Sequence, residues 1–431
     1  MLALLGFAMI ATFMILIMTR VLAAAVALVL IPIVFGLLAG HGADMAGMAI
    51  EGLSELAPIA VALAFAVLYF AIMIDAGLFD PLVRAAVRFS KGDPLRVTMA
   101  TATVATLVAL DGDGATVALV TIGAFLPLYQ RLGMNPLIIA VLLSPAALSG
   151  FTPWGGPLAR ASAALNVKMS DVFIPLIPTL LAGIATVFVI AWWLGVSERK
   201  RLGVANLETD TTDQLFDRPP GIARPRLLWV NLALTLALIA AIIAQFMPLP
   251  IAFMIGFSLA LVINYPKVSQ QRDRIAAHAA NALPIVILIF SAAIFTGILE
   301  GTGMVEAMAQ GLVNVLPEQM GPYFAPIIAL AGGPLTFIMS NDAYYFGIVP
   351  VLAETAGHYG VTPVEVARAS LLGLTIHSLS PLIAAIYLVA GLLKVEVGDL
   401  QRFGLPFAVL IFFVLIATAL LTGAVPIVAT R

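Results

Sequence analysis

Apolar stretches long enough to cross a lipid bilayer recur along this whole sequence, and they limit its fold more than any other feature. A membrane-spanning helix needs roughly 20 predominantly apolar residues. Of the 431 residues, 62% are hydrophobic and 10% are charged, whereas a soluble domain carries about a quarter charged residues. The sequence therefore predicts an all-α polytopic membrane protein.

The few polar residues exclude several kinds of site. The formal net charge is −2, which argues against a large surface for nucleic acid. The chain has no cysteine, so disulfides, thiolate metal sites and thiol nucleophiles are excluded. Any metal ion must be bound by oxygen atoms or by the four histidines. No tightly bound cofactor is expected.

Basic residues beside the apolar stretches predict the orientation. Arg20 follows the first apolar run, so residues 1–19 are expected to be a retained helix rather than a cleaved signal. Segment 80–96 is basic, while segment 41–55 carries three acids and no Lys or Arg. The positive-inside rule then places 80–96 and the linker 195–226 in the cytoplasm. Both termini are expected outside a cell (inner) membrane.

The chain divides into two halves with the same pattern of stretches. The first repeat, 1–194, is expected to contain scaffold helices, a re-entrant hairpin, a broken helix and a last helix at 1–79, 97–129, 135–165 and 172–194. The second, 227–431, is expected to contain them at 227–300, 323–358, 366–391 and 404–427. The second half starts inside where the first starts outside, which is typical of an inverted-repeat transporter with five helices in each half.

Four short strings interrupt the apolar stretches: LDGDGAT (110–116), TPWGGP (152–157), SND (340–342) and HSLSP (377–381). Irregular backbone at membrane depth is tolerated only where protein or a water-filled cavity surrounds it. Helix ends there also expose amide and carbonyl groups that bind ions. We therefore expect the four breaks to meet and to form a binding site.

The breaks supply three overlapping sets of candidate residues. The candidates for substrate binding are Thr152, Pro153, Trp154, Gly155, Gly156, Arg160, Ser340, Asn341, Asp342, His377, Ser378 and Ser380. Oxygen ligands suit Mg²⁺ or Ca²⁺, and the candidates for a metal ion are Asp111, Asp113, Thr116, Asn341 and Asp342. Acids and histidine inside a membrane protein are functional candidates, and those for proton coupling are Asp111, Asp113, Asp342 and His377.

Each of these residue types allows a structural role beside the functional one. The Arg160 guanidinium matches a carboxylate, or it extends to the outer headgroups near Lys168. Asp111 and Asp113 bind a ligand, or they cap a hairpin tip. His377 carries a proton, contacts substrate, or bonds a nearby backbone carbonyl.

Six strings together resemble the CitMHS family of citrate–metal ion/proton symporters, in the ion transporter superfamily. They are MLALLGFAMIATFMILIMT, SKGDPLRV, LDGDGAT, TPWGGPLARA, MSNDAYYFGIVPVLAE and HSLSPLIAA. The resemblance runs essentially end to end. It implies an elevator-type homodimer in the lipid bilayer that imports citrate complexed with a divalent metal ion, coupled to H⁺. Arg160 would then hold a citrate carboxylate.

Other functions remain as alternatives. Dicarboxylate relatives in that superfamily carry Ser-Asn-Thr at their hairpin tips, and SND is close to this motif. DGDGAT instead has acids, which favours protons or a divalent cation over sodium. A sodium-coupled di- or tricarboxylate transporter is the alternative, while an intramembrane aspartyl protease or a channel does not explain the paired breaks. An enzyme is not expected.

Overall fold

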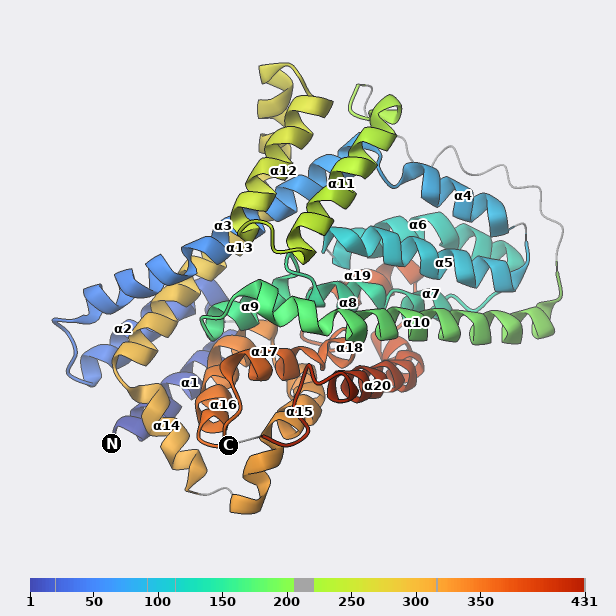
Figure 1. The fold of residues 1–431 in the computed structure, drawn as a ribbon. Helices are drawn as coiled ribbons and strands as arrows, with labels where there is room; N and C mark the ends of the chain where they lie inside the picture. Colours follow the sequence, from blue (N-terminus) through green and yellow to red (C-terminus); the bar gives the residue numbers. More distant parts are fainter. Residues whose placement is uncertain (20, 91, 113, 205–220, 315–316, 430–431) are drawn as a thin grey trace.

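The computed structural model describes residues 1–431 except 20, 91, 113, 205–220, 315–316 and 430–431 (Figure 1). The described residues form helices and turns, with no strand among them. Eight helical segments in this part of the chain are long and apolar enough to cross a membrane, and shorter apolar helices accompany them. The expected all-α membrane architecture is confirmed.

The first part of the chain begins with three helices and an amphipathic one. They are α1 (Leu2–Met18), α2 (Ala24–Leu38), α3 (Met45–Ala76) and α4 (Asp80–Ser90). A hairpin follows, formed by α5 (Pro94–Val108), η1 (Ala109–Asp111) and α6 (Gly114–Leu132). An interrupted helix and one long helix come next: α7 (Leu137–Leu142), α8 (Pro145–Leu148), η2 (Ser149–Phe151), α9 (Gly156–Ala164) and α10 (Met169–Leu202).

The second part of the chain follows the same order of elements. It begins with η4 (Pro225–Leu227), α11 (Leu228–Ile243), α12 (Leu249–Asn264), α13 (Val268–Gly301) and α14 (Met304–Val313). The second hairpin contains η5 (Glu318–Tyr323), α15 (Phe324–Ile338), the π-helix η6 (Ala343–Ile348) and α16 (Val349–Gly357). The last elements are α17 (Pro363–Leu371), α18 (Leu374–His377), α19 (Ala384–Leu393) and α20 (Val397–Leu421). The division into inverted repeats stays a prediction that this order supports.

Several helices extend beyond the apolar stretches that predict them. Glu51 and Glu55 lie inside α3 rather than in a loop, and α10 continues through residue 202 into the predicted linker 195–226. Residues 205–220 of that linker lie outside the described residues. Glu, Lys and Arg are good helix formers, so a helix continues into water where hydropathy has already fallen.

The long helices α3 and α13 pack against each other through glycines. A Cβ atom on Gly52 would lie 2.2 Å from the Ala293 carbonyl oxygen, and one on Gly297 would lie 2.4 Å from that of Met48. Small residues allow such close approach of helix backbones in membranes. This pair, together with α11 and α12 at the top of Figure 1, forms one part of the molecule.

The hairpins and broken helices are joined to α10 and α20. At one end of α10, Glu198 Oε2 accepts a hydrogen bond from the Asn135 backbone N–H at 3.2 Å. Near the other end, Arg368 of α17 donates to the Asp171 carbonyl oxygen at 2.6 Å. These contacts hold α10 against the segments after both hairpins.

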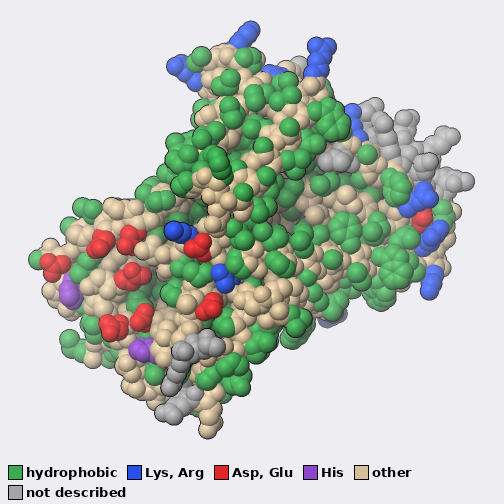
Figure 2. Space-filling model, in the orientation of Figure 1, with side chains coloured by type: hydrophobic (Ala, Val, Ile, Leu, Met, Phe, Trp, Pro, Cys, Tyr) green, Lys and Arg blue, Asp and Glu red, His purple; other side chains and the backbone are tan. Residues whose placement is uncertain are grey.

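Acidic and basic side chains gather at different ends of the molecule. Figure 2 shows Asp, Glu and His side chains around the end where α2 and α14 lie, and Lys and Arg at the tops of α11 and α12 and the far end of α10. The N-terminus lies toward the acidic end in Figure 1. This separation supports the predicted orientation, which stays a prediction.

Candidate functional site

The first hairpin tip and the two broken helices meet in the interior. The Trp154 indole N–H in the first break donates to the Leu110 carbonyl oxygen at the hairpin tip, at 2.8 Å. Gly112 at that tip has φ of +82°, which glycine adopts without steric cost. The second break lies beside the first, since a Cβ atom on Gly150 would come within 2.7 Å of the Leu374 side chain.

Arg160 pairs with Asp342 across these breaks. Its Nε donates to Asp342 Oδ1 at 2.7 Å, and the two side chains are 19% and 20% exposed. The guanidinium leans back over the start of α9, because a Cβ atom on Gly156 would lie 2.7 Å from its Nη1. Long side chains on a helix lean toward its N-terminus. The structure therefore shows Arg160 directed into the breaks and not extended toward the outer surface beside Lys168.

His377 is fixed by a backbone carbonyl at one ring nitrogen. Its Nδ1 lies 2.5 Å from the Thr336 oxygen, and a carbonyl oxygen accepts hydrogen bonds but donates none. Nδ1 therefore carries the hydrogen. The residue is 5% exposed, and within the described part of the chain its Nε2 has no hydrogen-bond partner. Of the roles considered for His377, the structure shows the contact with a backbone carbonyl. The Nε2 atom remains as a hydrogen-bond acceptor without a donor.

A cavity of about 390 Å³ lies at the breaks, within the roughly 300–1,000 Å³ range of small-molecule sites. His377 and Asn341 both line it. Like His377 Nε2, Asn341 Oδ1 is buried without a partner among the described residues. Buried polar atoms in proteins are nearly always hydrogen-bonded, so each of these two atoms lacks the partner that such an atom usually has.

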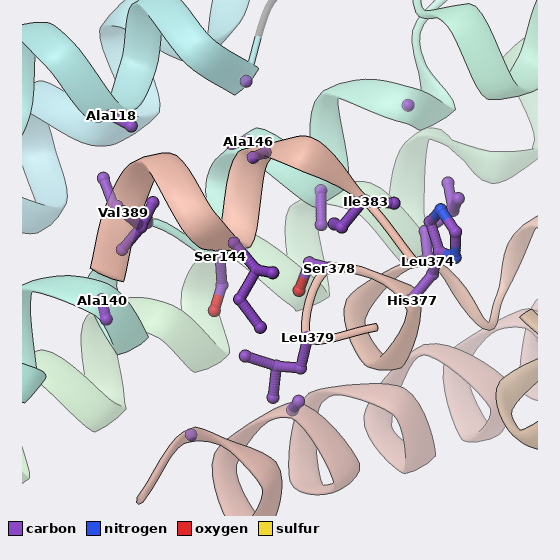
Figure 3. Close-up of a pocket in the computed structure, with 18 of the residues that line it drawn as sticks. Ala118, Ala140, Ser144, Ala146, Leu374, His377, Ser378, Leu379, Ile383 and Val389 are labelled. Carbon is purple, nitrogen blue, oxygen red and sulfur yellow. The ribbon is translucent and has the colours of Figure 1, made fainter. Parts of the chain in front are cut away.

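The cavity wall carries a few polar groups among apolar side chains. Figure 3 shows the Ser144 and Ser378 hydroxyl groups between His377 on one side and Val389 on the other. The remaining wall comes from the hairpin tip, the two breaks, α19 and α20, through residues that include Gly112, Gly114, Ser149, Leu379, Ile386 and Leu400. The site therefore offers hydroxyl, imidazole and amide groups beside an apolar surface.

Several predicted residues bond within the protein. Thr152 begins the turn Thr152–Gly155, which contains Pro153, and donates to the Ser149 carbonyl oxygen at 2.7 Å. Ser380 donates to the Phe337 carbonyl oxygen at 2.6 Å. The Ser340 hydroxyl accepts from the backbone N–H three residues later at 3.2 Å. Their hydroxyl groups shape the breaks.

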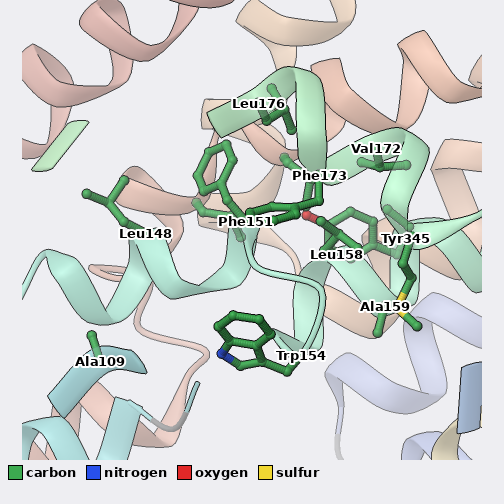
Figure 4. Close-up of a cluster of buried hydrophobic side chains, with 14 of the residues drawn as sticks. Ala109, Leu148, Phe151, Trp154, Leu158, Ala159, Val172, Phe173, Leu176 and Tyr345 are labelled. Carbon is green, nitrogen blue, oxygen red and sulfur yellow. The ribbon is translucent and has the colours of Figure 1, made fainter. Parts of the chain in front are cut away.

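Trp154 packs in the interior. Its ring lies 5.1, 6.5 and 5.9 Å from those of Phe70, Phe173 and Phe253, and it is 5% exposed. Figure 4 shows it with Phe151, Phe173 and Leu176 in a cluster of buried hydrophobic side chains. With its N–H bonded to Leu110, the indole connects the first break to the hairpin tip and to α3 and α12.

The structure describes the side chains of only some of the predicted metal ligands. Asp113 lies outside the described residues, as does the side chain of Asp111, which ends η1. Thr116 lies in the first turn of α6, and Asp342 contacts Arg160. Among the residues whose placement is described, no group of three or more His, Cys, Asp or Glu is arranged to hold a metal ion. The metal set stays a prediction.

Three residues of the candidate site were not predicted from the sequence. Ser144 and Ser149 line the cavity. The Ser144-Pro145 dipeptide matches Ser380-Pro381 in the second break, so the sequence could have indicated a break at Ser144. Thr336 contributes through its backbone carbonyl, and the sequence carries no signal for that.

The comparison with protein families decides the identity. A family model described as Citrate transporter matches residues 10–373. The chain belongs to the CitMHS family of citrate transporters. Two relatives from Bacillus subtilis (strain 168) match 99% of this chain over their full length: a "Citrate transporter" at 49% identity and a "Mg(2+)/citrate complex secondary transporter" at 47%. The CitMHS chain is thus a multi-pass membrane transporter and not an enzyme.

Two solved structures share the fold of this CitMHS member. The YdaH transporter of Alcanivorax borkumensis has a TM-score of 0.62 at 16% identity, covering 87% of this chain and 86% of that one. MtrF of Neisseria gonorrhoeae has a TM-score of 0.63 at 14% identity, covering 88% and 84%. At such identities the likeness concerns the fold alone.

Proposed function

We propose that this CitMHS member imports citrate as a complex with a divalent metal ion, in the Mg²⁺ or Ca²⁺ class, together with protons. The observation that carries the proposal is the cavity at the breaks, whose wall includes His377 and Asn341. Each of these two residues has a buried atom, Nε2 or Oδ1, without a hydrogen-bond partner in the described part of the chain. The name of the Mg²⁺/citrate relative supports the metal complex as cargo.

The polar groups on the cavity wall suit the donors and acceptors of citrate. His377 Nε2 accepts a hydrogen bond, which the citrate hydroxyl group donates. Ser144 and Ser378 each donate to the backbone carbonyl oxygen three residues earlier, at 2.6 and 2.7 Å. Their hydroxyl oxygens remain as acceptors for the citrate hydroxyl group or as ligands for the metal ion. Arg160, on the helix that follows the first break, provides the cationic fork for a carboxylate that the metal leaves free. Binding at these groups offsets the loss of water around an anion.

The metal ion enters as part of the cargo and needs few protein ligands. Gly112 and Gly114 line the cavity, and Asp113 stands between them in the sequence, with Asp111 just before. Carboxylates in that loop are hard oxygen ligands of the kind that Mg²⁺ and Ca²⁺ take. We include Thr116, Asn341 and Asp342 in the proposed metal set as further oxygen donors.

An elevator motion in a homodimer completes the proposal. Contacts from Glu198 and Arg368 join α10 to the segments that carry the breaks. The closely packed pair of α3 and α13 forms a separate part with α11 and α12. Two such bodies support sliding of the site-bearing part against a scaffold, as does the family resemblance.

The test is citrate uptake into proteoliposomes with a series of divalent cations, with EDTA, and with imposed proton or sodium gradients. We expect uptake that needs a divalent cation, stops with EDTA, and follows an inward proton gradient. Uptake that is lost when choline replaces sodium would instead support the sodium-coupled alternative. Uptake of metal-free citrate at the same rate would contradict the proposed cargo.

A further inference from the structure

One wall of the cavity at the breaks is formed by apolar residues. Helices α6, α7, α19 and α20 supply this wall, and none of their described residues that line the cavity has a polar side chain. We call these residues the apolar wall, and they include Ala118, Ala140, Ile386, Val389 and Leu400. The polar side chains on the cavity belong to the two interrupted helices and to the tip of the second hairpin. They are Ser144, Ser149, Asn341, His377 and Ser378.

The apolar wall and His377 lie on different sides of the cavity. In Figure 3, Ala118 and Val389 lie on the left and His377 lies on the right. The Ser144 and Ser378 hydroxyl groups lie between them in that view. All these residues line one cavity of about 390 Å³. A ligand bound beside His377 can therefore extend within the same cavity toward α6 and α19.

Much of the apolar wall belongs to a small hydrophobic cluster that is separate from the main core. The buried members of this cluster are Leu379, Ile386, Ala390, Leu400 and Ala408. All of them except Ala390 line the cavity. Protein interiors are normally close-packed, and side chains that face a void lose dispersion contacts on that side. An apolar group placed against this wall gains contacts that the protein itself does not make.

The metal–citrate complex has no partner on the apolar wall. Its carboxylates and its metal ion need polar or charged groups, and the described residues of the wall supply only hydrocarbon. Cavities lined by apolar side chains stay dry and bind apolar ligands. The space beside the wall therefore suits an alkyl group and not a further anionic group.

We infer that the apolar wall is a subsite for an alkyl group attached to citrate. The ligand class is a citrate alkylated on one of its methylene carbons, which keeps the carboxylates and the hydroxyl group for the metal ion and the breaks. This inference rests on the proposed function, because it requires the complex of citrate with a divalent metal ion to bind at the breaks. It extends the ligands of the site from citrate to amphipathic tricarboxylates.

Calorimetry of the purified protein at saturating Mg²⁺ tests the inference, with citrate and with its methyl, ethyl and butyl derivatives. Transfer of one methylene group from water to an apolar surface increases affinity by up to about fourfold. Affinity in wild type should therefore increase along the series from citrate to butylcitrate. Affinity that stays constant or falls along the series would overturn the inference. A lipid chain that already fills the space beside the wall would give that result.

A larger side chain on the apolar wall should remove this gain. Val389→Phe adds bulk from α19, on the side of the cavity away from His377 in Figure 3. The ratio of butylcitrate affinity to citrate affinity should then fall toward unity. Leu410→Phe, at an exposed position of α20 that does not line the cavity, is the matched control and should keep the wild-type ratio. A ratio unchanged by Val389→Phe would show that the alkyl group binds elsewhere and would overturn the inference. Ala140→Leu, on α7, replaces Val389→Phe if that protein does not fold.

Uptake of Mg²⁺–citrate into proteoliposomes provides a second readout, in a bilayer. Butylcitrate should inhibit this uptake at lower concentration than methylcitrate in wild type and in Leu410→Phe. The difference between the two inhibitors should be smaller in Val389→Phe. Equal inhibition of wild type by both derivatives would contradict the subsite.

The outcomes separate this inference from the proposed function. Wild type that binds no Mg²⁺–citrate contradicts the proposed function. Wild type that binds Mg²⁺–citrate, and gains no affinity from the alkyl group, contradicts only the apolar subsite.

Discussion

The sequence predicts the direction of the Arg160 side chain, but it does not predict the contact of Arg160 with Asp342. The position of Arg160 one turn after a glycine-containing break predicts that its side chain leans back into that break, and the structure shows it against Gly156. The partner is 182 residues away and reaches it because a second hairpin folds beside the first break. Helical periodicity does not encode that contact.

Arg160→Lys keeps the charge and loses the planar fork, so it should weaken binding of the metal–citrate complex about tenfold, or about 1.4 kcal/mol. Arg160→Ala also removes charge-assisted hydrogen bonds, which contribute about 1.5–3 kcal/mol each, and should weaken binding about a hundredfold or more. Calorimetry with saturating metal measures both. Arg131→Ala, at an exposed position in α6, is the control. Wild-type affinity in Arg160→Ala would remove Arg160 from the site.

His377 offers a pair of variants that separate its two nitrogens. His377→Asn keeps an amide near Nδ1, in reach of the Thr336 carbonyl oxygen, and loses Nε2. His377→Gln places its amide near Nε2. If Nε2 contacts citrate, Asn should lower affinity about tenfold, the effect of losing roughly one hydrogen bond, with little change in thermal stability. Gln should keep more of the affinity. The reverse order would show that the carbonyl contact is the one that matters.

At the scale of elements, the breaks were easier to predict than the helix ends. Gly-Asp-Gly and Thr-Pro strings break helices wherever they stand, because glycine and proline impose backbone constraints of their own. The end of α10 at residue 202 depends instead on contacts such as that of Glu198 with the Asn135 backbone. Trp154 was predicted as a possible ligand, and its packing among Phe70, Phe173 and Phe253 arises from helices far apart in sequence.

The first hairpin tip should depend on Gly112. Its φ of +82° costs a side-chain-bearing residue about 1–2 kcal/mol, and a Cβ atom there would lie 3.3 Å from Trp154. Gly112→Ala should therefore lower the melting temperature of the purified protein and slow uptake. Gly123→Ala, in α6 with nothing within 4 Å of the added Cβ, should be neutral or stabilising. Equal effects of both substitutions would contradict a strained tip.

At the scale of the whole molecule, the sequence predicts the sides of the membrane from charge, and the structure separates acidic and basic ends (Figure 2). Cysteines introduced at Ala43 and Ser197, both exposed, should react with an impermeant maleimide from opposite sides of the membrane, Ala43 from outside. The native chain has no cysteine to interfere. Labelling of both from the same side would rule out the proposed topology.

Calorimetric titration of the purified wild-type protein with citrate, in the presence of Mg²⁺ and again with EDTA, tests whether the protein binds citrate as the metal complex. We expect saturable binding with Mg²⁺ that is lost with EDTA. We also expect about tenfold weaker binding with Mg²⁺ in His377→Asn, because His377 lines the cavity and its Nε2 has no hydrogen-bond partner among the described residues. Equal binding of citrate with Mg²⁺ and with EDTA would contradict the claim that the cavity takes the metal complex.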